Sequence, residues 1–271
     1  MLNSYGNNVK PRIFNTKEIN NLIANIVEKI AVIADVLGIM LTGSITEHKI
    51  DCYMDLDLSI FSKTKNLDSL KRKIYVKYKQ LGAQKDNFKS IHSPFDDFSF
   101  QFNNIYVETE LYRLLDLKNT INNTLSGEIS DNGLIYSIQH GQIIYDKQQD
   151  LHKLQKQLKK LSYPTKLIEV CVKKYEAVSL KLLCHSINRG DYPSAYFWLW
   201  GTFFDTTKIL CAKNKTFMPA TKRLLLYYIP SLKKVPDGYI DFWHKIFKKG
   251  PANWKATYKQ ALHFMLEVKS Y

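Results

Sequence analysis

The chain has 271 residues, of which 45% are hydrophobic, 24% are charged and four are cysteine. This is the composition of a globular protein with a sizeable core, and it excludes a disordered or collagen-like chain. The cysteines lack C-x-x-C pairing and the polar first residues lack an apolar leader, so we expect a cytoplasmic protein without disulfides. The longest apolar stretch, 195–204, is too short to span a bilayer, so no membrane partner is expected.

The net charge of +14 is distributed unevenly along the chain. Residues 1–146 carry 16 Lys and Arg against 17 Asp and Glu, whereas residues 147–271 carry 23 against 8. A basic half of this kind suits an anionic partner such as a triphosphate or a nucleic acid. Lysine-rich helix surfaces without any partner explain it equally well, and the sequence leaves both interpretations open.

The first element expected along the chain is a long helix. Asn15 and Glu18 form a capping box, and isoleucines at helical spacing follow them. The pattern predicts a helix that runs to Leu37 and ends at Gly38. A short apolar run over 39–41 then predicts a buried strand.

Two-residue periodicity marks the strands that follow. The stretch 54–61 alternates polar residues, including Asp55 and Asp57, with apolar ones, as a strand with one buried face does. The other elements expected in this half are a helix over 67–81 and strands over 97–102, 105–111 and 141–145. This order predicts an α+β fold whose first domain has a small mixed sheet flanked by helices.

From residue 147 onward, strand-like alternation gives way to long helical patterns. Helices are expected over 148–161, 165–188, 191–213, 218–229, 237–248 and 251–268, with prolines near their ends. We therefore expect two domains, residues 1–146 with the mixed sheet and residues 147–271 as an all-α helical bundle.

The pattern that indicates chemistry is Gly43-Ser44, ten residues, and then Asp55-Leu56-Asp57. Carboxylates at i and i+2 of a strand point to the same face, and Mg²⁺ prefers carboxylate oxygens as ligands. A Gly-Ser turn offers backbone N–H groups on which a phosphate can rest. The spacing therefore predicts magnesium and triphosphate binding, whereas a bare D-x-D would favour a strand edge that merely faces solvent.

In its full context the pattern resembles the nucleotidyltransferase superfamily, which includes aminoglycoside- and lincosamide-modifying enzymes and poly(A) polymerases. The residues that carry the resemblance lie in 39–44 and 54–60, apolar flanks included. The resemblance implies that Asp55 and Asp57 are catalytic metal ligands for Mg²⁺. It also implies that the Gly-Ser turn contacts an NTP, expected to be ATP.

The family also uses a third carboxylate on a neighbouring strand, as a metal ligand or as the base for the acceptor hydroxyl. Glu108 and Glu110 share one face of the strand expected over 105–111. We prefer Glu108, because it sits early in its strand, as the aspartate pair does.

Basic residues of the second half are candidates for phosphate contacts. Lys222 and Arg223 follow a proline in a segment similar to one in the helical domains of bacterial relatives, and they open an expected helix. The resemblance implies that both bind the nucleotide. Lys173, Lys174 and Lys181 are rivals for the same role.

The resemblance implies transfer of a nucleoside monophosphate from an NTP to a hydroxyl, with release of pyrophosphate. A small, antibiotic-like acceptor is the first expectation, with a role in antibiotic resistance. The basic half would repel a polycationic aminoglycoside, so a neutral or anionic acceptor fits better. The alternative is a macromolecule, either a tRNA 3′ end, which the basic half suits, or a protein side chain. Several antibiotic-modifying relatives build their sites across a dimer, so the resemblance also leaves open that this chain forms a homodimer.

Overall fold

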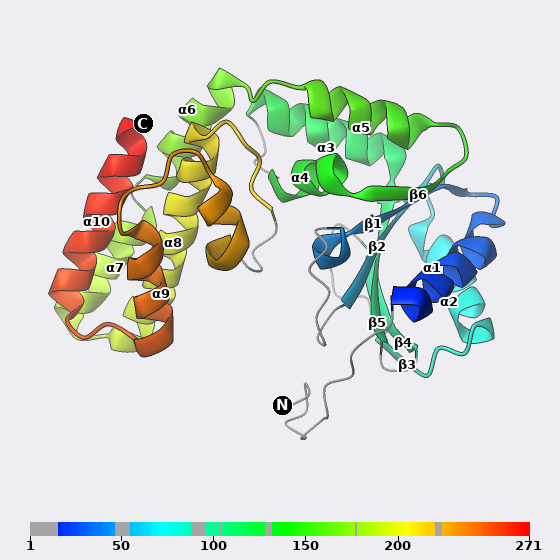
Figure 1. The fold of residues 1–271 in the computed structure, drawn as a ribbon, viewed down its shortest axis with the longest axis horizontal. Helices are drawn as coiled ribbons and strands as arrows, with labels where there is room; N and C mark the ends of the chain where they lie inside the picture. Colours follow the sequence, from blue (N-terminus) through cyan, green and yellow to red (C-terminus); the bar gives the residue numbers. More distant parts are fainter. Residues whose placement is uncertain are drawn as a thin grey trace. The chain divides into compact units, whose positions relative to one another are not determined.

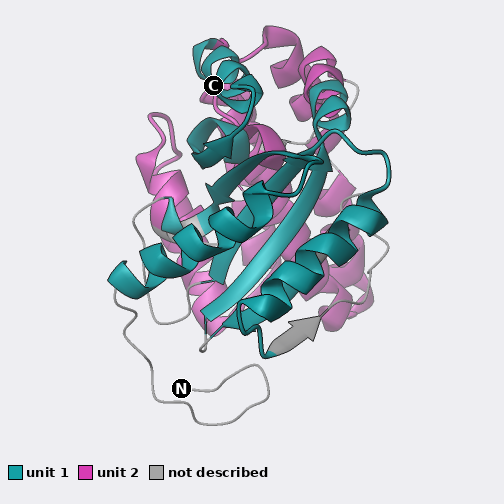
Figure 2. Ribbon diagram, turned by 90° about the vertical axis from the view of Figure 1, so that its right-hand side faces the viewer, with its two compact units in different colours: residues 1–119, 137–160 teal, residues 120–136, 161–271 magenta. Residues whose placement is uncertain are grey.

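The computed structural model describes residues 16–46, 55–87, 96–102, 105–127, 132–176, 178–219 and 224–271 (Figure 1). The chain divides into two compact units, unit 1 with residues 1–119 and 137–160 and unit 2 with residues 120–136 and 161–271 (Figure 2). The protein has the predicted α+β fold. Unit 1 includes residues 147–160, which lie beyond the boundary expected at residue 146. That the two sides of this boundary have different functions stays a prediction.

Unit 1 is built on a mixed sheet, which has six strands in the described part of the chain. These are β1 (Val36–Thr42), β2 (Asp55–Ser62), β3 (Lys85–Asn87), β4 (Asp96–Phe102), β5 (Ile105–Arg113) and β6 (Gln142–Asp146). Their order is β3-β4-β5-β2-β1-β6, with β2 and β5 parallel and the other neighbours antiparallel. The helices up to residue 160 are α1 (Thr16–Ala31), α2 (Leu67–Gln80), α3 (Leu114–Ser126), α4 (Asn132–His140) and α5 (Asp150–Lys160).

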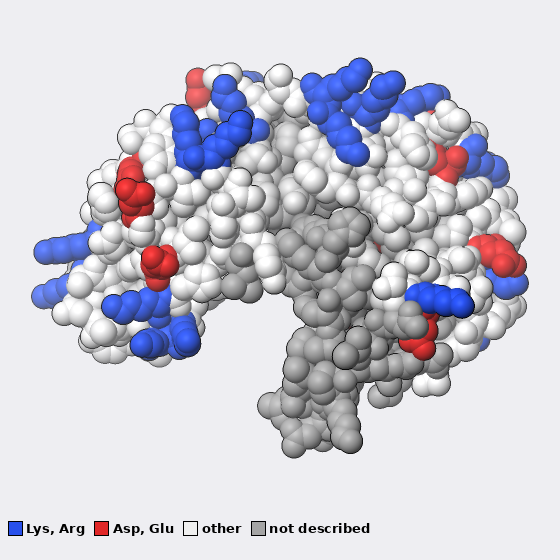
Figure 3. Space-filling model, in the orientation of Figure 1, with Lys and Arg blue, Asp and Glu red and all other residues white. Residues whose placement is uncertain are grey.

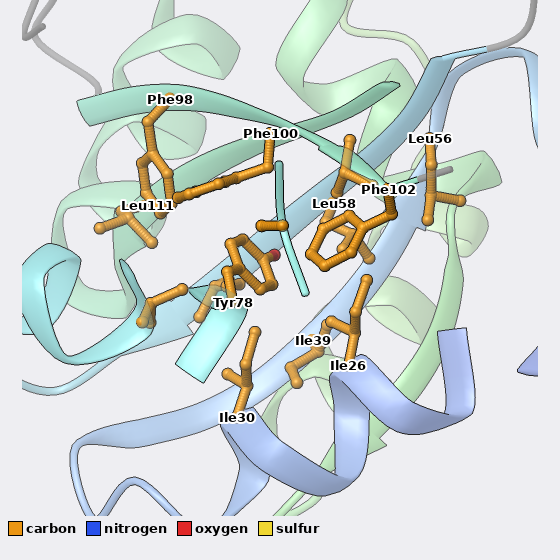
Figure 4. Packing of buried hydrophobic residues seen from close by; sticks show 14 of the residues in the cluster. Ile26, Ile30, Ile39, Leu56, Leu58, Tyr78, Phe98, Phe100, Phe102 and Leu111 are labelled. Carbon is orange, nitrogen blue, oxygen red and sulfur yellow. The ribbon is translucent and has the colours of Figure 1, made fainter. Parts of the chain in front are cut away.

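One face of this sheet is apolar and is covered by α1 and α2 (Figure 1). Phe98, Phe100 and Phe102 of β4 point to this face and surround the ring of Tyr78 from α2 (Figure 4), with ring centroids 4.6–6.2 Å apart. The Tyr78 hydroxyl shares a hydrogen bond of 2.9 Å with the Thr109 hydroxyl of β5. Burial raises the pKa of Tyr78, so the phenol stays neutral and serves the core. On the opposite face, Met40 of β1 and Phe61 of β2 are buried, and the polar residues of that face lie beyond them.

The start of β1 differs from the prediction. The first helix ends at Ala31 rather than at Leu37, and Gly38 lies inside the strand, so the predicted helix end was wrong. A Cβ on Gly38 would lie 3.1 Å from Cγ of Leu151 in α5 and would overlap the end of that side chain. Gly38 is therefore required for the close packing of α5 on the strand, and it does not stop a helix.

Two helices between β5 and β6 were not predicted. The α3 sequence is rich in Asn and Thr, which favour turns and caps over helix interiors. Its Leu114, Leu117, Ile121 and Thr124 are nevertheless buried on one helical face, and the Thr124 hydroxyl donates to the carbonyl of Thr120 at 2.9 Å. Packing thus overrides a weak local preference.

The described part of unit 2 is helical. Its elements after residue 160 are α6 (Thr165–Tyr175), α7 (Val178–Arg189), α8 (Tyr192–Lys213), the π-helical turn η2 (Leu224–Tyr228), the 3₁₀ turn η3 (Ile229–Ser231), α9 (Tyr239–Lys249) and α10 (Trp254–Ser270). Their core gathers around the buried rings of Trp243, Tyr239 and Phe264. None of the helices in the described ranges combines the length and the apolar character that a membrane crossing requires.

Two helical predictions in unit 2 need correction. The helix expected over 165–188 is two helices, because α6 ends at its C-cap Glu176. In place of the helix expected over 218–229, the described residues form the turns η2 and η3. Pro230 lies in η3, where its missing N–H prevents a regular α-helix from continuing.

Candidate active site

Asp55 and Asp57 lie on β2, on the face of the sheet opposite the core. They alternate with buried Leu56 and Leu58, and both remain partly accessible. Asp57 is paired with Thr42 of β1 on one side and with Glu108 of β5 on the other. Paired residues of neighbouring strands share a face. Asp57 therefore stands between two strands that contribute polar residues to the same surface.

The turn that follows β1 brings Gly43 against Asp57. Gly43 has φ +68°, a left-handed conformation that favours glycine. A Cβ at this position would lie 2.8 Å from Cγ of Asp57 and would overlap its Oδ2. The Gly43 carbonyl accepts hydrogen bonds from the Thr46 N–H at 3.3 Å and the Thr46 hydroxyl at 2.8 Å. The backbone of Ser44 lies in the same short turn, so the predicted Gly-Ser turn adjoins the carboxylate.

The sheet register distinguishes the two glutamates of β5. Glu108 is the strand neighbour of Asp57, whereas Glu110 is the neighbour of Ser59. Glu110 accepts hydrogen bonds from the Ser59 hydroxyl at 3.4 Å and from the Tyr112 hydroxyl at 2.8 Å. Glu108 is exposed, and no residue in the described ranges forms a hydrogen bond or ion pair with it. Glu108 is therefore the glutamate of β5 that lies beside Asp57 in the sheet.

The donor atoms of this face suit a magnesium ion that arrives with a triphosphate. Within the described ranges, no three His, Cys, Asp or Glu side chains are grouped closely enough to hold a metal ion by themselves. Mg²⁺ is commonly held by one or two carboxylates, with waters and substrate phosphates as its other ligands. Asp55 and Asp57 supply two carboxylates on one face, and the Gly43 turn places backbone next to one of them. These residues fit the ion, and Glu108 as a third ligand stays a prediction.

Sequence reasoning missed the polar residues that flank the carboxylates. Tyr106, with 41% of its surface exposed, pairs with Asp55 on β2 and with Gln101 on β4. Ser99 of β4 pairs with Glu108. Two rows of paired residues, one through Asp55 and one through Asp57, therefore cross from β2 over β5 to β4 on this face. The alternation of phenylalanine with polar residues over 98–102 was the signal that could have placed Ser99 and Gln101 on this face.

The basic residues expected to bind phosphate belong to the second half of the chain. Lys222 and Arg223 lie outside the described residues. Lys173 and Lys174 occupy the last turn of α6 and Lys181 lies in α7, all in unit 2 and all exposed. The Lys174 ammonium lies over the ring of Tyr175, 5.3 Å from its centroid. Their role toward a nucleotide stays a prediction.

Comparison with known proteins gives distant likenesses to solved structures. No family model matches the chain, and no curated protein matches its sequence significantly. A similar solved structure is a nucleotidyltransferase-like protein from Exiguobacterium sibiricum 255-15. It is 11% identical, with a TM-score of 0.45, over 93% of this chain and 74% of that chain. A likeness this distant assigns no residue role and no substrate to this protein.

Proposed function

We propose that the protein is a Mg²⁺-dependent nucleotidyltransferase that transfers a nucleoside monophosphate from an NTP, ATP by first expectation, to an acceptor hydroxyl. The observation that carries the proposal is the position of Asp57. Its carboxylate adjoins the Gly43 turn, shares a strand face with Asp55 and neighbours Glu108 across the parallel β2–β5 pair. Two carboxylates suited to a metal ion, a turn suited to a phosphate and a further carboxylate therefore support the proposal together.

In the proposed reaction each residue has a distinct role. Asp55 and Asp57 hold Mg²⁺, which when bound neutralises charge on the triphosphate. The backbone at Gly43 positions the phosphates beside Asp57. The acceptor oxygen forms a bond to the α-phosphorus of the NTP. The bond from that phosphorus to the oxygen that bridges the α- and β-phosphates breaks, and its electron pair leaves with pyrophosphate. Glu108 takes the proton of the acceptor hydroxyl.

The acceptor is proposed to be a small, neutral or anionic molecule, in keeping with an antibiotic-modifying role. The charge distribution supports a second candidate, because residues 147–271 carry 23 Lys and Arg against 8 Asp and Glu. A basic surface attracts a polyanion, so a tRNA 3′ end is the macromolecular acceptor that the charge favours over a protein side chain.

The test is incubation of the full chain with Mg²⁺ and each NTP labelled at the α-phosphate, in the presence of an antibiotic panel, total tRNA or cell lysate. We expect label on one acceptor class, and we expect Asp57→Asn to abolish the transfer while retaining the fold by circular dichroism. Label on tRNA or protein alone would refute the small-molecule acceptor. Unchanged transfer by Asp57→Asn would refute the metal assignment.

A further inference from the structure

A group of exposed aromatic side chains lies on the surface of unit 2. Large aromatic side chains are usually buried to a high degree, so a cluster that stays exposed indicates an interaction surface. We call this cluster the aromatic face. It consists of Tyr192 (49% exposed), Tyr196 (51%), Phe197 (66%) and Trp200 (46%) of α8 and Phe247 (39%) of α9.

Ring contacts hold four of these side chains in place, and Phe197 meets Trp198 of α8 edge-on at 4.9 Å. Tyr192 stacks on Trp254 of α10, with centroids 5.6 Å apart and planes 17° apart, and Tyr196 meets the same ring edge-on at 4.9 Å. Trp200 packs edge-on against Phe247 at 4.7 Å. Tyr192, Tyr196 and Trp200 follow one another at four-residue spacing, about 6 Å along the helix axis. They therefore form a fixed series of rings, each with surface left accessible.

The helices beside these rings are strongly basic. Between residues 239 and 260 the sequence has a single acidic residue, Asp241. Figure 3 shows basic side chains in blue at the lower left, where Figure 1 draws the end of α9 and the start of α10. The exposed lysines are Lys245, Lys248 and Lys249 near the end of α9 and Lys255 and Lys259 in α10. Phe247 directly precedes two of them in the chain, so aromatic and cationic residues occur together in this segment.

The combination of exposed rings and lysines distinguishes two possible partners, a second copy of the chain and a nucleic acid. A second copy of the chain on a two-fold interface would set the same lysines against each other, and their repulsion opposes such a dimer. Single-stranded nucleic acid offers the complementary chemistry, because its bases stack on aromatic rings and its phosphates attract lysines. A duplex keeps its base faces inside its own stack. We propose that the aromatic face binds single-stranded nucleic acid.

The binding does not depend on the proposed transfer reaction, so it is measured without NTP. The full chain is titrated against a fluorescently labelled 12-nucleotide single-stranded RNA, and anisotropy reports binding. Phe197→Ala and Trp200→Ala should each weaken binding about tenfold, because a lost base–ring stack costs roughly 5- to 150-fold in affinity. Leu266→Ala, which removes an exposed apolar side chain of α10 outside the aromatic face, should bind as the parent does.

The lysines are tested by the salt dependence of the same binding. Lys248→Ala combined with Lys249→Ala should reduce the slope of log affinity against log salt by about 1.4, since each lost single-strand phosphate contact contributes roughly 0.7. The matched pair Lys153→Ala and Lys156→Ala, exposed on α5 of unit 1, should leave the slope unchanged. Thermal melting followed by circular dichroism verifies that all variants fold.

Three results would overturn this assignment. One is parental RNA affinity in both ring variants, and another is equal affinity for a duplex of the same length. The third is self-association of the parent through these rings in sedimentation, with no binding of RNA. The Asp57→Asn variant is expected to bind RNA as the parent does. A failure of RNA binding therefore leaves the transfer proposal standing, and a failure of transfer leaves this one standing.

Discussion

Gly43 is the residue at which backbone conformation and the proposed chemistry meet. Gly43→Ala would place a methyl group against the Asp57 carboxylate and force a left-handed φ on alanine. The conformational term alone costs about 1–2 kcal/mol. We expect this variant to lose transfer activity through displacement of Asp57, beyond its loss of stability. Urea unfolding and labelled-NTP transfer measure the two effects separately.

Gly82 provides the matched control for that change. It has φ +86°, and a Cβ at this position would meet no atom of the described residues within 4 Å. Gly82→Ala therefore carries the conformational cost without the clash. We expect a similar loss of stability, about 1–2 kcal/mol, with parental transfer. Equal activity of the Gly43→Ala and Gly82→Ala variants would show that the Gly43 contact with Asp57 has no role in transfer.

The two glutamates of β5 provide a second comparison at single residues. Glu108→Gln removes the proposed proton acceptor beside Asp57, and we expect transfer to fall by about 10²–10⁴. Glu110→Gln keeps an oxygen that can accept from Ser59 and Tyr112, so near-parental transfer is expected. Steady-state rates at saturating NTP and Mg²⁺ measure both. The reverse order of losses would move the catalytic role to Glu110.

At the residue scale the sequence predicts faces but not neighbours. The two-residue period places Asp55 and Asp57 on one side of their strand, because alternation is a local property. The choice between Glu108 and Glu110 needs the register of β2 against β5, which is set by tertiary packing. The sequence does not predict Tyr106 as a neighbour of Asp55 for the same reason, since the partners of Tyr106 are fixed only when the strands pair.

At the scale of elements, β1 is positioned by its packing against α5. Gly38→Ala would add a methyl group where the side chain of Leu151 already lies, and we expect a loss of about 1–3 kcal/mol in the free energy of unfolding. Leu151→Ala in the same chain should recover part of this loss by vacating the space. Urea unfolding of the parent, both single variants and the double variant measures the coupling. Strictly additive effects would contradict the contact.

Strands and long helices are the elements that the sequence predicts well. The strand patterns over 54–61 and 97–102 and the helix over 67–81 correspond to β2, β4 and α2, because their periodicity is strong. The sequence missed α3, whose Asn and Thr residues obscure the apolar stripe. It also joined α6 and α7, since apolar spacing continues on both sides of their junction.

At the scale of the whole molecule, the change from strand to helix patterns near residue 147 does not coincide with the division into compact units. Strand patterns end with β6, whereas α5 is grouped with unit 1, and Leu151 of α5 packs on Gly38. A contact between residues so far apart in the chain leaves no local pattern. The charge difference between the halves is, in contrast, fully visible in the sequence.

The most direct test of nucleotidyl transfer compares ATP labelled at the α-phosphate with ATP labelled at the γ-phosphate. Both are incubated with the full chain, Mg²⁺ and the acceptor fraction, and the products are separated by thin-layer chromatography. Attack at the α-phosphorus predicts that the α label enters the acceptor and the γ label appears in pyrophosphate. Transfer of the γ label to the acceptor would contradict the account, because it would make the protein a kinase.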